Sequence, residues 1–133
     1  MTNNSYDPAG HVKLSVSNAN ISKEFYNNLF NQLKWKKVTE SNWGAGWVSS
    51  AGFGFWIKEA ENKTHSHNFS SPGIHHFCFK VSSKEEVDKL YKFLVKENVK
   101  IYDKPSPYPE YTKDYYAVFF ADPDGIKLEV AYY

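Results

Sequence analysis

Hydrophobic and polar residues alternate along seven segments of the chain, and apolar residues recur at helical spacing in two others. Because side chains of a strand point alternately to its two faces, the first pattern predicts β-strands. The predicted strands are 12–17, near 35–40, 45–50 and 53–58, then 74–81, 115–121 and 126–132. The two helical patterns are carried by Ile21, Phe25, Leu29 and Leu33 and by Val87, Leu90, Tyr91 and Leu94. Each helix therefore follows a strand.

Short local motifs mark where some of these elements begin and end. Ser83, with Glu86 three residues later, resembles a capping box at the start of the second helix. Asp122-Pro-Asp-Gly125 is a turn sequence, because proline presets one backbone angle and glycine relaxes another, so the last two strands are expected to form a hairpin. Three prolines within 104–113 predict a rigid extended loop, since proline cannot donate to a sheet.

The order of elements occurs twice. The segment that begins at His11 recurs at His76, and a shift of 65 positions also aligns the apolar positions of the two helices. We interpret the chain as two βαβββ modules, at about 10–58 and 73–132, joined by a polar connector at 59–72. Two copies are too few for a solenoid, so we expect the α+β chain 1–133 to form a single domain in which the halves shield each other.

The amino-acid composition narrows the classes of ligand that the protein is expected to bind. Sixteen basic residues, all lysine, nearly balance fifteen acidic ones, which argues against binding to nucleic acid or an anionic membrane and leaves small molecules as expected ligands. Without arginine, two-point recognition of carboxylates and phosphates is weakened. Cys78 is the only cysteine, so a disulfide or a thiolate zinc site cannot form within the chain. The first residues carry no targeting pattern, and we expect a cytoplasmic protein.

Three polar side chains are predicted to share the helix-free faces of the sheets. By strand alternation, His11 opposes the apolar side of the first strand, His76 that of the strand opening the second module, and Glu129 that of the last strand. Two imidazoles and one carboxylate form a facial triad that leaves coordination positions open for a substrate. We therefore expect a divalent ion, whether zinc, iron, manganese, nickel or cobalt, at His11, His76 and Glu129, with Glu129 also catalytic.

Further residues on or near these faces are candidates for substrate contacts. Aligning Gly52 with Gly125 places Trp56 where the second module has Glu129, so a symmetric fourth ligand is missing and Trp56 becomes a candidate wall for a planar ligand. Lys127 and Tyr116 complete the predicted substrate-binding set. Taken singly, each histidine would be interpreted as an ordinary polar residue at the start of a strand, and Glu129 as an exposed residue on a solvated sheet face. Their equivalent places in the two modules favour the metal site.

Three stretches carry a resemblance to a known superfamily. They are the strand from His11 with the Phe25-Tyr26 pair of the next helix, Gly73-Ile-His-His-Phe-Cys-Phe-Lys-Val, and the segment from Tyr115 to Glu129. Across roughly 10–132 the chain resembles the vicinal oxygen chelate superfamily, which contains glyoxalase I, bleomycin-resistance proteins, fosfomycin-resistance enzymes and extradiol dioxygenases. The resemblance implies a curled open barrel with helices on the outer face, and metal ligands in the first and last strands of each module.

The resemblance and the residues together lead to a ranked set of functions. We expect a metal-dependent enzyme on a small oxygen-bearing substrate, with isomerase or lyase chemistry favoured. Trp56 cannot shuttle a proton as the glutamate or glutamine of glyoxalase I does, and the lack of arginine disfavours glutathione and fosfomycin as substrates. The alternatives are a metal-free binding protein of the bleomycin-resistance type, a dioxygenase using Tyr115 or Tyr116, and an interaction scaffold. A homodimer is also expected.

Overall fold

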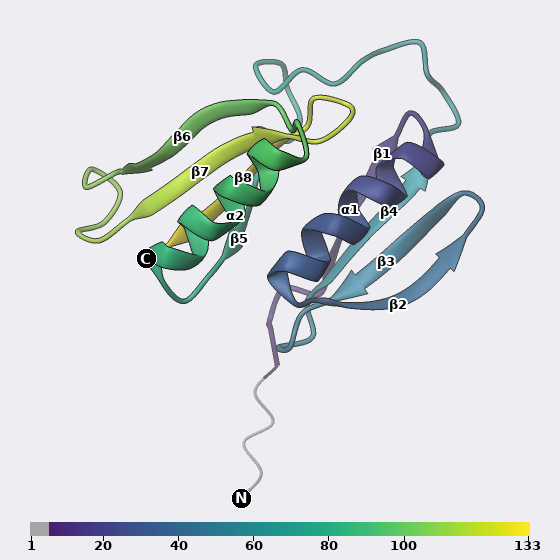
Figure 1. The fold of residues 1–133 in the computed structure, drawn as a ribbon. Coiled ribbons are helices and arrows are strands. Elements are labelled where there is room, and N and C mark those ends of the chain that lie inside the picture. The colour runs from purple at the N-terminus through teal and green to yellow at the C-terminus, as the bar shows by residue number, and fades with distance from the viewer. Residues whose placement is uncertain (1–5) are drawn as a thin grey trace, which may run out of the picture. The chain divides into compact units, whose positions relative to one another are not determined.

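The computed structural model describes residues 6–133 and divides the chain into two compact units, one ending at His65 and the other beginning at Ser66 (Figure 1). The division falls inside the polar connector predicted at 59–72. The expectation that the chain carries no targeting pattern rests in part on residues 1–5, which lie outside the described part of the chain. In the described residues, no helix combines the length and the apolar character needed to cross a membrane.

Unit one contains one helix and one four-stranded mixed sheet. Its elements are β1 (His11–Val16), α1 (Ala19–Leu33), β2 (Lys36–Ser41), β3 (Gly44–Val48) and β4 (Gly54–Glu59). The strand order is β1-β4-β3-β2, with β1 parallel to β4 and the other neighbours antiparallel. Helix α1 packs against β2, β3 and β4, which leaves the other face of the sheet free of helices (Figure 1).

Unit two repeats this arrangement. Its elements are β5 (Phe77–Lys80), α2 (Lys84–Lys96), β6 (Ile101–Pro107), β7 (Tyr116–Ala121) and β8 (Lys127–Tyr132). The strand order β5-β8-β7-β6, with β5 parallel to β8, matches unit one strand for strand. Helix α2 packs against β6, β7 and β8. The predicted α+β class with two βαβββ modules is thus confirmed.

Helix α1 is capped as its sequence dictates, but its buried face differs from the predicted one. The side chain of Asn18 accepts a hydrogen bond from the Ile21 backbone N–H at 3.1 Å, which caps the helix start. Ile21 was expected inside and is 56% exposed. The buried positions are Ala19, Ser22, Tyr26, Leu29 and Phe30, so of the predicted positions Leu29 is buried. A strict four-residue repeat drifts around a helix of 3.6 residues per turn, so spacings of four, seven and eight identify the buried face better.

Large aromatic side chains fill the core of unit one between α1 and the sheet. Tyr26 and Phe30 project from the helix, and Trp47 and Phe55 project from β3 and β4 toward them. Phe30 stacks on Trp47 with ring centroids 4.9 Å apart, and Tyr26 lies 5.1 Å from Phe55. Burial of such rings is the main favourable contribution to folding in a unit of this size. Trp47 and Phe55 are therefore core residues of unit one.

The segment rich in prolines is partly a strand, which corrects the predicted loop at 104–113. Strand β6 runs through Pro105 to Pro107 and pairs with β7 on one side only. Its register shifts twice, between Ile101 and Asp103 and between Asp103 and Ser106. An edge strand tolerates proline because the missing N–H can face away from the ladder, and irregular register relieves the remaining conflict.

Two turn and cap motifs of unit two form as predicted. The Ser83 hydroxyl accepts a hydrogen bond from the Glu86 N–H at 3.2 Å, although the Glu86 carboxyl group reaches back to the N–H of Ser82 rather than of Ser83. In the turn between β7 and β8, the Asp122 carboxyl group accepts hydrogen bonds from the N–H groups of Asp124 and Ile126, both at 2.8 Å. Gly125 has a φ of 78°, which glycine adopts readily.

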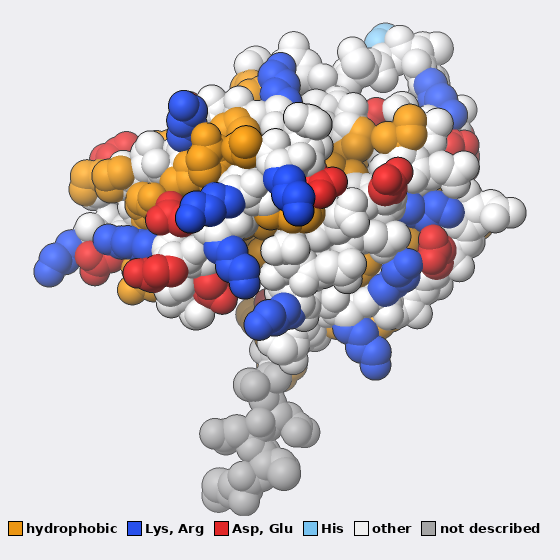
Figure 2. Space-filling view, viewed as in Figure 1, with side chains coloured by type: hydrophobic (Ala, Val, Ile, Leu, Met, Phe, Trp, Pro, Cys, Tyr) orange, Lys and Arg blue, Asp and Glu red, His pale blue; other side chains and the backbone are white. Residues whose placement is uncertain are grey.

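Charged side chains are mixed over the visible surface. Figure 2 shows lysine and acidic side chains interspersed, without a large region of one sign on that face. This distribution agrees with the near balance of the sequence and offers no electrostatic footprint for a polyanion there.

Candidate functional site

Glu129 is the buried acid of unit two. It lies in the middle of β8, paired with Cys78 of β5 on one side and Phe119 of β7 on the other, and is 2% exposed. Strand alternation turns it to the face opposite α2, where Ala117, Phe119 and Ala131 form a small apolar cluster. A carboxyl group so deeply buried requires polar partners, because leaving it unpaired would be costly.

Two side chains satisfy the carboxyl oxygens of Glu129. The Nε2 atom of His76 lies 3.0 Å from Oε2. The hydroxyl group of Tyr115 donates a hydrogen bond to Oε1. His76 precedes β5 and Tyr115 precedes β7, so residues far apart in the sequence converge on the acid from both neighbouring strands. The carboxyl group is therefore fixed in position before any ligand arrives.

His75 and His76 lie side by side, although alternation along the predicted strand 74–81 would turn adjacent residues to opposite faces. Strand β5 begins only at Phe77, so alternation does not constrain the two histidines. Their Nδ1 atoms are 2.7 Å apart. Burial lowers the pKa of His76, opposed by the charge of Glu129, while His75 and Lys127 lower it further. A neutral imidazole is the form that ligates metals.

Lys127 lies among aromatic rings near this pair. Its ammonium group is 4.8 Å from the centroid of Phe119, 5.0 Å from Phe69 and 5.8 Å from Tyr102. Phe119 in turn meets the His76 ring edge to face at 5.7 Å. Cation–π contacts of this kind hold a charge in place while leaving its hydrogen-bond donors available. Lys127 is thus positioned close to the histidine, as its strand parity predicts.

Cys78 pairs with Glu129 across the sheet but has no reactive character. Its burial, together with the nearby Glu129 charge, raises the pKa of the thiol to about 12. The thiolate is the nucleophilic form, and it is strongly disfavoured here. Burial, and then the hydrogen bond to Glu129, likewise raises the pKa of Tyr115. Of these two groups Tyr115 donates a hydrogen bond to the acid, whereas the Cys78 thiol donates to the backbone carbonyl of Phe79 at 3.7 Å.

Tyr116, which belongs to the predicted substrate-binding set, lies on the other face of the sheet from Glu129, toward helix α2. Its hydroxyl group donates a hydrogen bond to Asp88 of helix α2 at 2.6 Å. Tyr115 is the tyrosine beside the carboxyl group. The register shows why: Phe119 pairs with Glu129, and residues two and four positions away share its face. Strand parity, applied to β7 as it was to β8, identifies Tyr115.

His11 opens β1 of unit one, and Trp56 lies beside it. A Cβ atom placed on Gly54 would lie 2.7 Å from the Trp56 indole nitrogen and 3.1 Å from the Cβ atom of His11. Trp56 pairs with Lys13 in the parallel register that pairs Glu129 with Cys78 in unit two. The structure therefore confirms that Trp56 holds the place in unit one that Glu129 holds in unit two.

The donor set can be compared with what a divalent ion requires. His76 and Glu129 supply an imidazole and a carboxyl group at one point of unit two, a combination that suits the metals named above. His11 belongs to unit one. Over residues 6–133, no three side chains of His, Cys, Asp or Glu are gathered as metal ligands would be. Two of the three predicted ligands therefore fit a metal and lie together within one unit.

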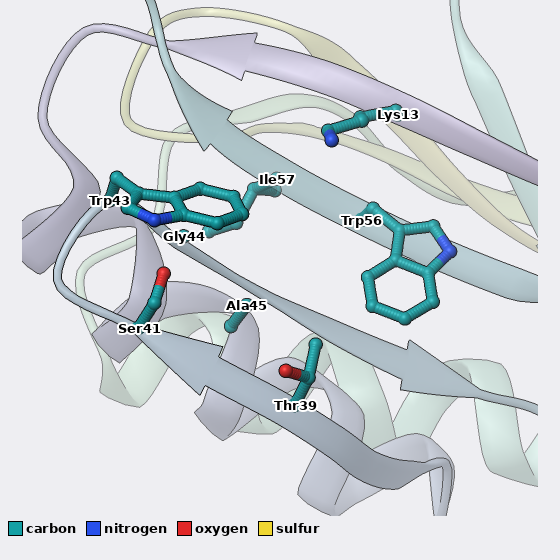
Figure 3. A pocket seen from close by; sticks show the side chains of 8 residues that line it. All are labelled: Lys13, Thr39, Ser41, Trp43, Gly44, Ala45, Trp56 and Ile57. Atoms are coloured by element: carbon teal, nitrogen blue, oxygen red, sulfur yellow. The ribbon is translucent and has the colours of Figure 1, made fainter.

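Unit one contains a cavity of about 320 Å³ on the helix-free face of its sheet (Figure 3). Trp43 and Trp56 stand at its two ends, Lys13 reaches in from β1, and Thr39 and Ser41 line it from β2. Of these residues, only Trp56 belongs to the predicted substrate-binding set. The alternation of β2 and the turn position of Trp43 carried a signal, but only the folded sheet brings them together.

Comparisons with known proteins agree with the topology. A family model described as Glyoxalase/Bleomycin resistance protein/Dioxygenase superfamily matches residues 9–130. Metallothiol transferase FosB of Lysinibacillus sphaericus (strain C3-41) is 31% identical over 122 residues, covering 90% of this chain and 77% of that protein. Its namesake from Staphylococcus saprophyticus subsp. saprophyticus is 29% identical over 120 residues, covering 90% and 73%.

A solved structure shows the same likeness. The glyoxylase/bleomycin resistance protein/dioxygenase domain from Frankia sp. EAN1pec matches with a TM-score of 0.76 at 25% identity, over 96% of this chain and 93% of that one. The resemblance predicted from three sequence stretches is confirmed. Because the family model spans most of its length, the chain belongs to the Glyoxalase/Bleomycin resistance protein/Dioxygenase superfamily.

Proposed function

We propose that the protein is a metal-dependent enzyme acting on a small oxygen-bearing substrate, with His76, Glu129 and His11 as the metal ligands. The observation that carries the proposal is the contact of the His76 imidazole with the buried Glu129 carboxyl group. Burying such a carboxyl group is costly unless it serves structure or function, and perturbed groups of this kind cluster at functional sites. The similarity to two metallothiol transferases supports dependence on a metal.

A bound divalent ion would act as a Lewis acid on neighbouring substrate oxygens and stabilise the anion that forms there. The residues of unit two have distinct tasks around it. Tyr115 fixes the orientation of Glu129, the proposed catalytic carboxyl group, through Oε1. Lys127, held over Phe119 and its aromatic neighbours, attracts a negatively charged substrate oxygen. These tasks fit isomerase or lyase chemistry, which we favour over dioxygenase chemistry.

Metal counting tests this proposal. The protein is loaded separately with Zn²⁺, Mn²⁺ and Ni²⁺, freed of unbound ion and analysed by mass spectrometry for metal per chain. We expect a single ion per chain, lost in His76→Ala, in Glu129→Gln and in His11→Ala. His65→Ala, a change in the exposed connector, is the control and keeps the ion. Stoichiometric binding that persists in His76→Ala excludes the site.

The cavity of unit one favours a second function, sequestration of a ligand without chemistry. Its two tryptophans offer aromatic walls, and they stand in the unit whose equivalent of Glu129 is the indole of Trp56. Saturable ligand binding by protein kept in excess chelator, with no turnover after metal is restored, would favour this function. Ligand binding that requires metal would favour the enzyme.

We also propose that the chain forms a homodimer in a reducing cytoplasm. Exposed aromatic side chains, among them Tyr111 and Trp43, support an association surface, and the single Cys78 supports a compartment without disulfides. Sedimentation velocity measures the first point directly. A monomer at concentrations well above those used for the metal assay would exclude the dimer.

A further inference from the structure

We propose that the cavity of unit one binds a planar aromatic carboxylate that carries a hydrogen-bonding substituent on its ring. The inference rests on the second function proposed above, ligand binding without chemistry in this cavity, and deepens it by naming the class of ligand. It requires neither the metal nor any residue of unit two. All of the residues that line the cavity lie within unit one, on β1, β2, β3, β4 and the turn between β2 and β3.

The shape of the cavity selects a flat ligand. Its volume of about 320 Å³ lies at the lower end for small-molecule sites, which suits a molecule of one or two rings. Gly44 and Ala45 form a floor without bulky side chains, and the two indoles rise at the ends (Figure 3). Aromatic faces bind planar rings by stacking or by edge contacts.

The Trp56 ring lies directly over Gly46. A Cβ atom on Gly46 would lie 1.9 Å from the Trp56 ring, so the indole occupies space that only glycine leaves open. Trp43, at the other end, is 53% exposed. A tryptophan left so exposed beside a cavity offers apolar surface that a ligand could cover.

The charge of the cavity selects an anion. The Lys13 ammonium group lies 5.7 Å from the Trp43 ring, and within residues 6–133 no carboxyl group forms an ion pair with it. Lys58 lies 5.9 Å from the same ring but is paired with Glu61 at 3.3 Å. No acidic side chain lines the cavity. A single carboxylate would therefore find one available positive charge.

A buried hydroxyl group selects a second polar contact. The Oγ atom of Ser41 is buried and has no hydrogen-bond partner among the described residues, and the side chain lines the cavity. Buried hydroxyl groups are nearly always hydrogen-bonded, so this one calls for a partner from outside the protein. In Figure 3 Ser41 and Lys13 approach the space from different strands, β2 and β1. A ligand that meets both needs polar atoms at two places on its ring.

Calorimetric titration of the metal-free protein in chelator tests the proposal with three matched probes. They are 6-hydroxy-2-naphthoate, 2-naphthoate, which lacks the hydroxyl group, and 2-naphthol, which lacks the carboxylate. We expect wild-type protein to bind 6-hydroxy-2-naphthoate most tightly. Absence of saturable heat with this probe, or equal affinity for 2-naphthol, overturns the proposal.

Variants assign the contacts. Lys13→Met should weaken both naphthoates about tenfold and leave 2-naphthol unchanged, since it removes a charge-assisted contact and keeps the apolar stem. Ser41→Ala should weaken only the two hydroxylated probes, by about fivefold. Lys58→Met is the control for Lys13 and should change nothing. Equal naphthoate affinity in wild-type protein and Lys13→Met contradicts the proposal.

Failure of this inference is distinguishable from failure of the proposed function. His76→Ala should lose metal and keep naphthoate binding, and Lys13→Met should keep metal and weaken naphthoate binding. Trp43→Leu provides a further test, because its exposed ring can be removed without harm to the core and should weaken all three probes. Near-ultraviolet circular dichroism confirms that each variant is folded.

Discussion

The two units share a backbone plan and differ in what they place on the equivalent sheet face. Sheet order and parallel register are the same, so Lys13 faces Trp56 in unit one as Cys78 faces Glu129 in unit two. In unit two the buried Glu129 carboxyl group has polar partners, whereas in unit one the Trp56 ring packs over Gly46. The register of a duplicated fold thus fixes where a side chain stands, and the residue type decides its chemistry.

The aromatic residues are also divided between the units. All four tryptophans lie in unit one, and of the ten tyrosines only Tyr6 and Tyr26 lie there. Tryptophan fluorescence therefore reports on unit one, and the tyrosine signal in near-ultraviolet circular dichroism reports chiefly on unit two. Each unit can be followed separately when the comparison is tested by mutation.

The largest expected effect concerns the aromatic core of unit one. Phe30→Ala removes a fully buried ring that stacks on Trp47, and should lower the free energy of unfolding by about 3–5 kcal/mol. Urea denaturation followed by tryptophan fluorescence measures this loss. Ile21→Ala in the same helix is the control and should change stability by less than about 0.5 kcal/mol. A large loss in the control would contradict the buried face described for α1.

Unit two is tested through the partners of its acid. Tyr115→Phe removes the donor to Glu129 and should cost about 1.5–3 kcal/mol, because a buried carboxyl oxygen loses its hydrogen bond. Urea denaturation followed by near-ultraviolet circular dichroism is the measurement. Tyr111→Phe, an exposed ring of the same tyrosine cluster, should be nearly neutral. Equal effects of the two changes would show that Tyr115 acts only through packing.

The indole of unit one can be displaced by a single methyl group. Gly46→Ala should cost about 1–3 kcal/mol, because the added Cβ overlaps the Trp56 ring, and should shift tryptophan emission as that ring moves. Gly10→Ala, where a Cβ would meet nothing within 4 Å, is the matched control. An unchanged emission spectrum in Gly46→Ala would mean that Trp56 does not lie against β3.

The smallest expected effect on stability concerns Tyr116, which lies on the helix side of the unit-two sheet. Hydrogen bonding to Asp88 raises the pKa of Tyr116 from 10.0 to about 12. The folded state therefore favours the protonated phenol, and the stability it contributes is complete below pH 10 and lost as pH rises toward 12. Since the pair is largely exposed, Tyr116→Phe should cost no more than about 1 kcal/mol and reduce this alkaline loss.

Absorbance titration of the phenol groups checks the assignment. Asp88→Asn should move the late-titrating tyrosine to lower pH, as loss of the acceptor charge requires. Persistence of the same titration in Asp88→Asn would assign the raised pKa to another cause. Neither change should alter metal content, because Tyr116 and Asp88 lie on the helix side of the sheet.

Much of the fold could be predicted because its signals are local. The cap at Ser83, the turn from Asp122 and the alternation that turns Glu129 away from α2 all act over a few residues. Predictions failed where the outcome depends on which strands pair and where a strand begins. The prolines of β6 are tolerated because, among the described residues, no strand pairs with one edge of β6. The two adjacent histidines meet because β5 starts after them.

The candidate site divides in the same way. Strand parity predicts the face of Glu129, and the duplication predicts that Trp56 stands in the place of Glu129. His76 reaches the acid from just before β5, where strand alternation does not apply. The acid's hydrogen-bond partner Tyr115 follows only from the register of β7 against β8, which the sequence does not state. The cavity between Trp43 and Trp56 depends on four strands, so residue spacing alone could not indicate it.

By itself the sequence determined the repeated order of elements, the family and the polar face of each strand, because period, turn chemistry and motif spacing are properties of neighbouring residues. Only the tertiary structure decided which polar groups become partners. It placed His76 and Tyr115 on the two oxygens of Glu129, and it left the Ser41 hydroxyl, in the cavity that Lys13 also lines, without a partner among the described residues. The reason is physical: burial and hydrogen bonding are set by strand pairing between segments that lie far apart along the chain.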